Sequence, residues 1–167
     1  MILGMSLATF TQFHVIISLI AIISGIVVVL GMMGAKRMPG MTALFLITSV
    51  ATSATGFIFP TPFDAADVVG IISLVCLAAA ILALYTYKLA GAWRRVYVVG
   101  ALAALYFNCF VLVVQSFLKI PFFHALAPTQ KEPPFAVAQG VVLILFIALG
   151  VAALKRFRPL AQAPAIA

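Results

Sequence analysis

Eight polar side chains could together form a binding site, because they supply imidazole, hydroxyl, carboxylate and amide groups to otherwise apolar segments. They are His14, Ser18, Thr52, Ser53, Asp67, Asn108, Gln115 and Gln139. An unpaired polar group is costly in an apolar environment, so such side chains either pair within the fold or face a polar cavity. Pairing would bond hydroxyls to carbonyls of their own helix and use amides to hold helices together. A cavity would form a pocket for a small ligand.

The two histidines add the chemistry of a redox cofactor site. Imidazole ligates haem iron, copper and zinc, which makes His14 and His124 the candidate metal ligands. The chain contains neither an HxxxH nor a CxxCH motif. A bound haem or quinone is therefore one hypothesis, and its alternative is that neither imidazole binds a ligand.

No catalytic residue is predicted. The serines lie outside any GxSxG turn, and no aspartate stands beside either histidine in the sequence. The only carboxylates, Asp64, Asp67 and Glu132, lie near the ends of apolar segments. An ion-coupled transporter usually keeps an ionisable group deep within the membrane, so this placement argues against that class.

The composition indicates an integral membrane protein. Of the 167 residues, 66% are hydrophobic and 8% are charged, and the mean hydropathy is +1.30. Soluble domains carry roughly a quarter charged residues. The net charge of +7 comes from basic residues in short connections, which suit a lipid bilayer as the partner. No basic and aromatic platform supports nucleic-acid binding.

Five segments are long and apolar enough to be membrane-spanning helices. They are residues 11–33, 41–59, 66–87, 96–117 and 135–154. The sequence thus predicts an all-α integral membrane bundle of five transmembrane helices in a single domain, 1–158, followed by a flexible tail at 159–167. Asp64 or Asp67 could cap the third helix. The proline-containing segment 119–134 is predicted to be a loop with an extended path.

The charge distribution predicts the orientation. Eight basic residues fall on one side: Lys36, Arg37, Lys88, Arg94, Arg95, Lys155, Arg156 and Arg158. The other side holds Lys119, Lys131 and all three acids. The positive-inside rule then places the N-terminus outside and the C-terminus in the cytoplasm. Most of the polar set falls in the outer half of the bilayer, with Asn108 near its midplane, so a shared pocket would face outward.

The segment 96–117 has the features of a central packing helix. Small and amide side chains follow one another on one face at steps of three and four, at Tyr97, Ala101, Ala104, Asn108, Val111 and Gln115. Two amides on one seam need hydrogen-bonding neighbours within hydrocarbon. We expect Asn108 and Gln115 to hold helices or subunits together.

Three strings, TGFIFP at 55–60, YFNCFVLVVQSF at 106–117 and LAPTQKEPPF at 126–135, resemble a family of short uncharacterised bacterial inner-membrane proteins. The resemblance covers nearly the whole chain. It implies a multi-pass protein of the bacterial cytoplasmic membrane and an all-helical bundle. It implies no activity, cofactor or catalytic residue.

The sequence favours a non-enzymatic accessory or interaction subunit of a larger membrane assembly, which binds other membrane subunits or further copies of itself. The chain is small, its predicted connections are short, and it carries no soluble domain. One alternative is a redox module that holds haem or quinone in the outward-facing pocket. Another is a small-molecule carrier or an oligomeric channel that uses the hydroxyls of segment 41–59.

Overall fold

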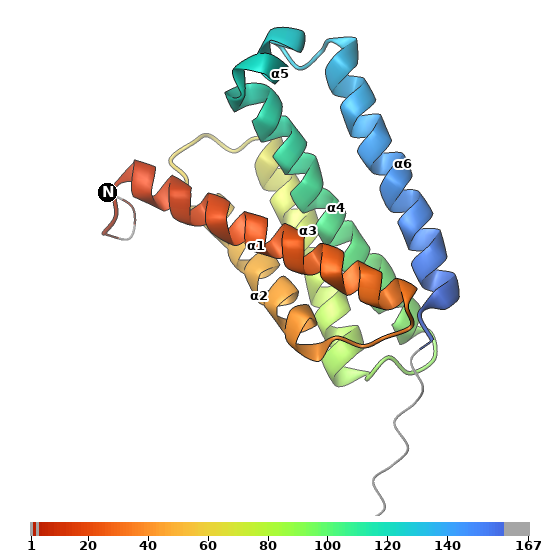
Figure 1. Ribbon diagram of the computed structural model, residues 1–167. Coiled ribbons are helices and arrows are strands. Elements are labelled where there is room, and N and C mark those ends of the chain that lie inside the picture. Colours follow the sequence, from red (N-terminus) through yellow and green to blue (C-terminus); the bar gives the residue numbers. More distant parts are fainter. Residues whose placement is uncertain (1, 3, 159–167) are drawn as a thin grey trace, which may run out of the picture.

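The computed structural model describes residue 2 and residues 4–158, and its regular structure in these residues is helical (Figure 1). The helices are α1 (Leu7–Met33), α2 (Pro39–Gly56), α3 (Ala65–Ile81), the π-helical turn η1 (Leu82–Thr86), α4 (Trp93–Lys119), α5 (Pro121–Leu126) and α6 (Pro133–Arg156). The prediction of an all-α bundle is confirmed. The tail predicted at 159–167 lies outside the described residues.

Four helical segments are long and apolar enough to cross a membrane, which makes the chain a multi-pass membrane protein by length and composition. They are α1, the continuous helix formed by α3 and η1, α4 and α6. The remaining predicted span, at 41–59, corresponds to α2, which has 18 residues. Helix α2 is not among the four because its six Ser and Thr side chains lower its hydropathy.

Side-chain caps determine where α1 and α3 begin. The Asp64 carboxylate accepts a hydrogen bond from the backbone N–H of Ala66 at 2.7 Å, and the Asp67 carboxylate accepts one from the Asp64 N–H at 2.9 Å. This reciprocal capping box confirms the predicted acidic cap. Ser6 caps α1 by accepting from the Thr9 N–H at 3.1 Å, so α1 begins before the predicted start at residue 11.

The connection between α4 and α6 is more ordered than predicted. The sequence analysis expected an extended loop over 119–134, and this was wrong for residues 121–126, which form α5. Pro121 lies in the first turn of α5, and Pro133 and Pro134 lie in the first turn of α6. Proline suits this position because its fixed φ is helical and its missing N–H has no partner in a first turn.

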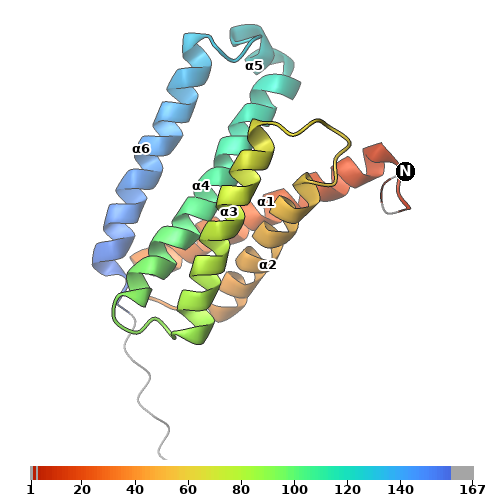
Figure 2. The same ribbon diagram turned by 180° about the vertical axis from the view of Figure 1, so that it is seen from behind.

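Helix α4 is the centre of the bundle and packs against each of the other helices (Figures 1 and 2). On its predicted seam, Tyr97, Ala101 and Ala104 are buried, and the later seam residues are half-buried. The prediction of a central packing helix is therefore confirmed.

The core lies toward one end of the bundle. This end carries the α1–α2 connection, the start of α4 and the end of α6, and we call it the basic end because eight Lys and Arg residues lie there. Most buried residues of α1 and α4 belong to its half of those helices. From the basic end, α1 and α6 diverge toward the opposite end (Figures 1 and 2). The opposite half is thus more loosely packed.

Glycine allows α4 to approach the backbone of α3 closely in this core. A Cβ added at Gly100 on α4 would lie 2.7 Å from the Cys76 carbonyl oxygen and 3.3 Å from the Ala80 Cβ, both on α3. Small residues permit such close contact between helices, whose association in hydrocarbon depends on van der Waals packing. The contact atoms include backbone, which cannot move aside as a flexible side chain can.

We expect Gly100→Ala to lower the free energy of unfolding by about 1–3 kcal/mol, the usual cost of an overpacked core. Gly150→Ala on α6 is the matched control, because an added Cβ there would meet no atom within 4 Å. Thermal unfolding of each purified variant in mild detergent measures its stability relative to the unsubstituted protein. Equal melting temperatures for the two variants would contradict the close contact.

Candidate functional site

His14 forms a contact between α1 and α2 toward the opposite end of the bundle. Its Nδ1 lies 2.8 Å from the Thr55 hydroxyl oxygen. That hydroxyl donates its only hydrogen to the Ala51 carbonyl at 2.7 Å, so it accepts from His14. The Phe59 ring packs edge-on against the imidazole, with centroids 5.2 Å apart, and also contacts Phe10 at 5.1 Å. The hydrogen bond to Thr55 and the contact with the Phe59 ring together fix the orientation of the imidazole.

Asn108 joins α4 to α2. Its side-chain N–H donates to the hydroxyl oxygen of Ser49 at 3.2 Å, and Ser49 is fully buried. On α2, the Thr52 hydroxyl is shielded from solvent and has no hydrogen-bond partner in the described part of the chain. The expected role of Asn108 as an interhelical amide is thus confirmed.

Gln139 joins α6 to α4. Its side-chain N–H donates to the Phe110 carbonyl at 3.2 Å, and its buried carbonyl oxygen has no partner among the described residues. Gln115 is half-buried on α4. Ser18 donates to the His14 carbonyl of its own helix at 2.7 Å, as hydroxyls commonly do in apolar helices.

Ser53 and Asp67 line a small cavity between the end of α2 and the start of α3, together with Phe57 and Gly70. Of the eight predicted residues, these two face this cavity. The other six belong to the contacts described above or to the half-buried faces of their helices. Across helices, His14, Asn108 and Gln139 each bond a residue outside the predicted set, at α1–α2, α2–α4 and α4–α6. Ser53 and Asp67 are the two predicted residues that share a cavity.

The second histidine lies apart from these contacts, on α5. The Nδ1 of His124 lies 3.2 Å from the Phe117 carbonyl, and the residue is exposed. Within residue 2 and residues 4–158, no three His, Cys, Asp or Glu side chains group closely enough to hold a metal ion.

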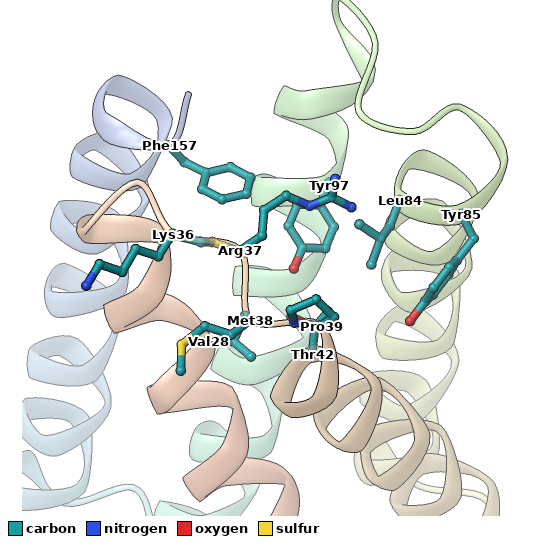
Figure 3. A pocket seen from close by; sticks show the side chains of 11 residues that line it. Val28, Lys36, Arg37, Met38, Pro39, Thr42, Leu84, Tyr85, Tyr97 and Phe157 are labelled. Carbon is teal, nitrogen blue, oxygen red and sulfur yellow. The ribbon is translucent and has the colours of Figure 1, made fainter. Parts of the chain in front are cut away.

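The sequence analysis did not predict a second cavity, at the basic end (Figure 3). Its lining comes from the α1–α2 connection, η1, α4 and Phe157. These segments are distant in sequence, and their basic residues were interpreted only as determinants of orientation. The available signal was the adjacent pair Lys36 and Arg37, which falls on the same side as Tyr85 and Tyr97.

Comparisons of the chain with protein-family models, curated proteins and solved structures found no match. The resemblance carried by the three strings therefore stays a prediction. The function is inferred below from the contacts and charges of the chain itself.

The Asn108–Ser49 hydrogen bond makes a measurable coupling between α4 and α2. In a double-mutant cycle of Asn108→Leu and Ser49→Ala, we expect a coupling free energy of about 0.6 kcal/mol, typical of hydrogen bonds between membrane helices. The control cycle pairs Asn108→Leu with Thr48→Val, because Thr48 donates to its own helix at Leu44. Unfolding in detergent gives both values, and equal coupling in the two cycles would contradict the contact.

Proposed function

We propose that the protein is a non-enzymatic accessory or interaction subunit of a larger assembly in the bacterial inner membrane. In this proposal the chain crosses the bilayer five times, with its N-terminus outside and its C-terminus in the cytoplasm. The observation that carries the subunit role is the exposure of α6. Two further features, the course of α2 and the placement of charge, support the topology.

Helix α2 extends from one end of the bundle to the other. Its first residues line the basic-end cavity beside Tyr97, whereas Thr55 near its end bonds His14 in the first half of α1. Eighteen residues rise about 27 Å as an α-helix, close to the ~30 Å thickness of a hydrocarbon core. This length and placement support α2 as a fifth crossing, in which Thr48 and Thr55 donate to carbonyls of their own helix.

Charge separates along the bundle axis. Eight basic residues lie at the basic end, while Asp64, Asp67 and Glu132 lie at the α2–α3 and α5–α6 connections of the opposite end. Cytoplasmic connections of membrane proteins carry an excess of Lys and Arg. The basic end is therefore assigned to the cytoplasm.

Helix α6 is much less covered than its neighbours. Only 6% of its most apolar 18-residue window is buried, against 44% in each of α1 and α4. Lipid tails are as apolar as the side chains of α6, so the position of a membrane helix depends on packing and interhelical hydrogen bonds. Toward the opposite end, α6 has few such contacts within the chain. A neighbouring subunit would supply the missing ones.

The amides beside α6 support the same conclusion. Gln139 keeps an unpartnered carbonyl oxygen among the described residues, and Gln115 is half-buried on the adjoining helix α4. A donor side chain on a partner helix could bond the Gln115 amide, whereas the Gln139 oxygen is buried within the chain. Interhelical hydrogen bonds of this kind favour a defined neighbour over lipid.

Cysteine accessibility tests the five-crossing topology. In a background of Cys76→Ala and Cys109→Ala, we expect a membrane-impermeant maleimide to label Thr61→Cys in intact cells and Lys36→Cys only after lysis. Lys131→Cys and Arg95→Cys are the controls for the outer and cytoplasmic sides. Labelling of Lys36→Cys and Thr61→Cys from the same side would show that α2 does not cross the membrane.

Site-specific photo-crosslinking tests the subunit role. A photoreactive residue replaces Ile144 on α6 or, as matched control, Ile47 on α2, whose side chains are 69% and 68% exposed. In native membranes we expect a protein adduct of defined mass at position 144, and lipid adducts alone at position 47. Mass spectrometry then identifies the partner. Lipid adducts alone at both positions would overturn the proposal.

A further inference from the structure

The cavity at the basic end combines an apolar interior with a cationic rim. Val28, Met32 and Leu84 contribute apolar side chains, while Lys36 and Arg37 come from the exposed α1–α2 connection. Figure 3 shows the Arg37 side chain extending toward Tyr97, whereas Lys36 projects in the opposite direction.

One wall of this cavity is held in place by a side chain outside it. Arg94 at the start of α4 donates to the Leu154 carbonyl at 3.1 Å and to the Phe157 carbonyl at 2.6 Å. These bonds satisfy carbonyls at the C-terminal end of α6. Phe157, which is 2% exposed, contacts Tyr97 and lines the cavity. Arg94 therefore uses its guanidinium for structure, whereas Arg37 lies free at the rim.

No acidic side chain lies near the rim cations in the part of the chain that the structure describes. All three acidic side chains of the chain lie at the opposite end. An anion that enters the cavity therefore meets uncompensated positive charge. Arginine binds phosphate through two parallel N–H donors, which lysine can supplement as a point charge. The hydroxyls of Tyr85 and Tyr97 add polar groups close to the rim.

We propose that this cavity binds an anionic phospholipid. Its phosphate would lie at Arg37, with Lys36 adding positive charge at the rim, and its first acyl carbons would lie against the apolar side chains of Val28 and Leu84. Basic pockets between membrane helices on the cytoplasmic side bind anionic headgroups in this way. A free phosphate offers the same charge, but it leaves the apolar interior empty. The site requires a membrane-embedded bundle and is independent of the accessory role.

Native mass spectrometry of the full-length protein in detergent tests the site. The probes are phosphatidylglycerol and phosphatidylcholine with identical acyl chains, and inorganic phosphate as competitor. We expect preferential binding of phosphatidylglycerol, weakened about fivefold by Arg37→Gln, the effect typical of one basic residue at a membrane surface. Arg95→Gln is the matched control, because it removes the same charge from an exposed position outside the cavity lining, and we expect it to leave binding unchanged.

Three outcomes would overturn the site. Equal binding of the two lipids would show that charge does not select the ligand. Equal weakening by Arg37→Gln and Arg95→Gln would indicate diffuse attraction to the basic end. Displacement of the lipid by inorganic phosphate would identify a free anion as the ligand. Melting temperatures verify that each variant is folded, and Lys36→Gln provides a second rim variant if Arg37→Gln is unstable.

Discussion

The close packing of α4 against its neighbours is the constraint on which the bundle depends. Hydrocarbon gives no hydrophobic drive for helix association, so the helices must meet through shape and hydrogen bonds. Gly100 brings α4 to the backbone of α3, and Ala101 and Ala104 are buried on the same helix. Larger residues follow farther along the seam, at Asn108 and Gln115, and there the burial decreases. The small residues Gly100, Ala101 and Ala104 thus account for the close packing of α4 toward the basic end.

In the looser half, specific polar and aromatic contacts replace close packing. The His14–Thr55 bond and the Phe59 ring connect α1 with α2 and with the turn that follows it, and Gln139 connects α6 with α4. The Phe117 and Phe135 rings add an edge-on contact between α4 and α6, with centroids 5.4 Å apart. At its other end, α6 is held through its final carbonyls by Arg94. Helix α6 has one fully buried residue, Ala153, and an exposed outer face, so it is well suited to contact another membrane subunit.

The basic residues serve the fold in more than one way. As a group they provide the charge asymmetry that orients a membrane protein. Individually they differ by position, because Arg94 is bonded to the end of α6 while Arg37 lies at the mouth of a cavity. Since the acids are all at the opposite end, the positive charge of the basic end must be balanced from outside the chain. The anionic headgroups of a bilayer surface can supply the negative charge, and the cavity beside Arg37 is one position where such a headgroup could bind.

The sequence by itself determined the features that depend on local residues. Hydropathy predicted the long helices, the spacing of small residues predicted the central role of 96–117, and Asp64 with Asp67 predicted the start of α3. It missed α5, because a proline can open a helix as readily as it extends a loop. Only the tertiary structure decided that His14 meets Thr55, that Asn108 meets Ser49, and that a cavity forms beside Arg37. Those contacts join residues tens of positions apart, and their register depends on how two helix surfaces pack, which no local pattern specifies.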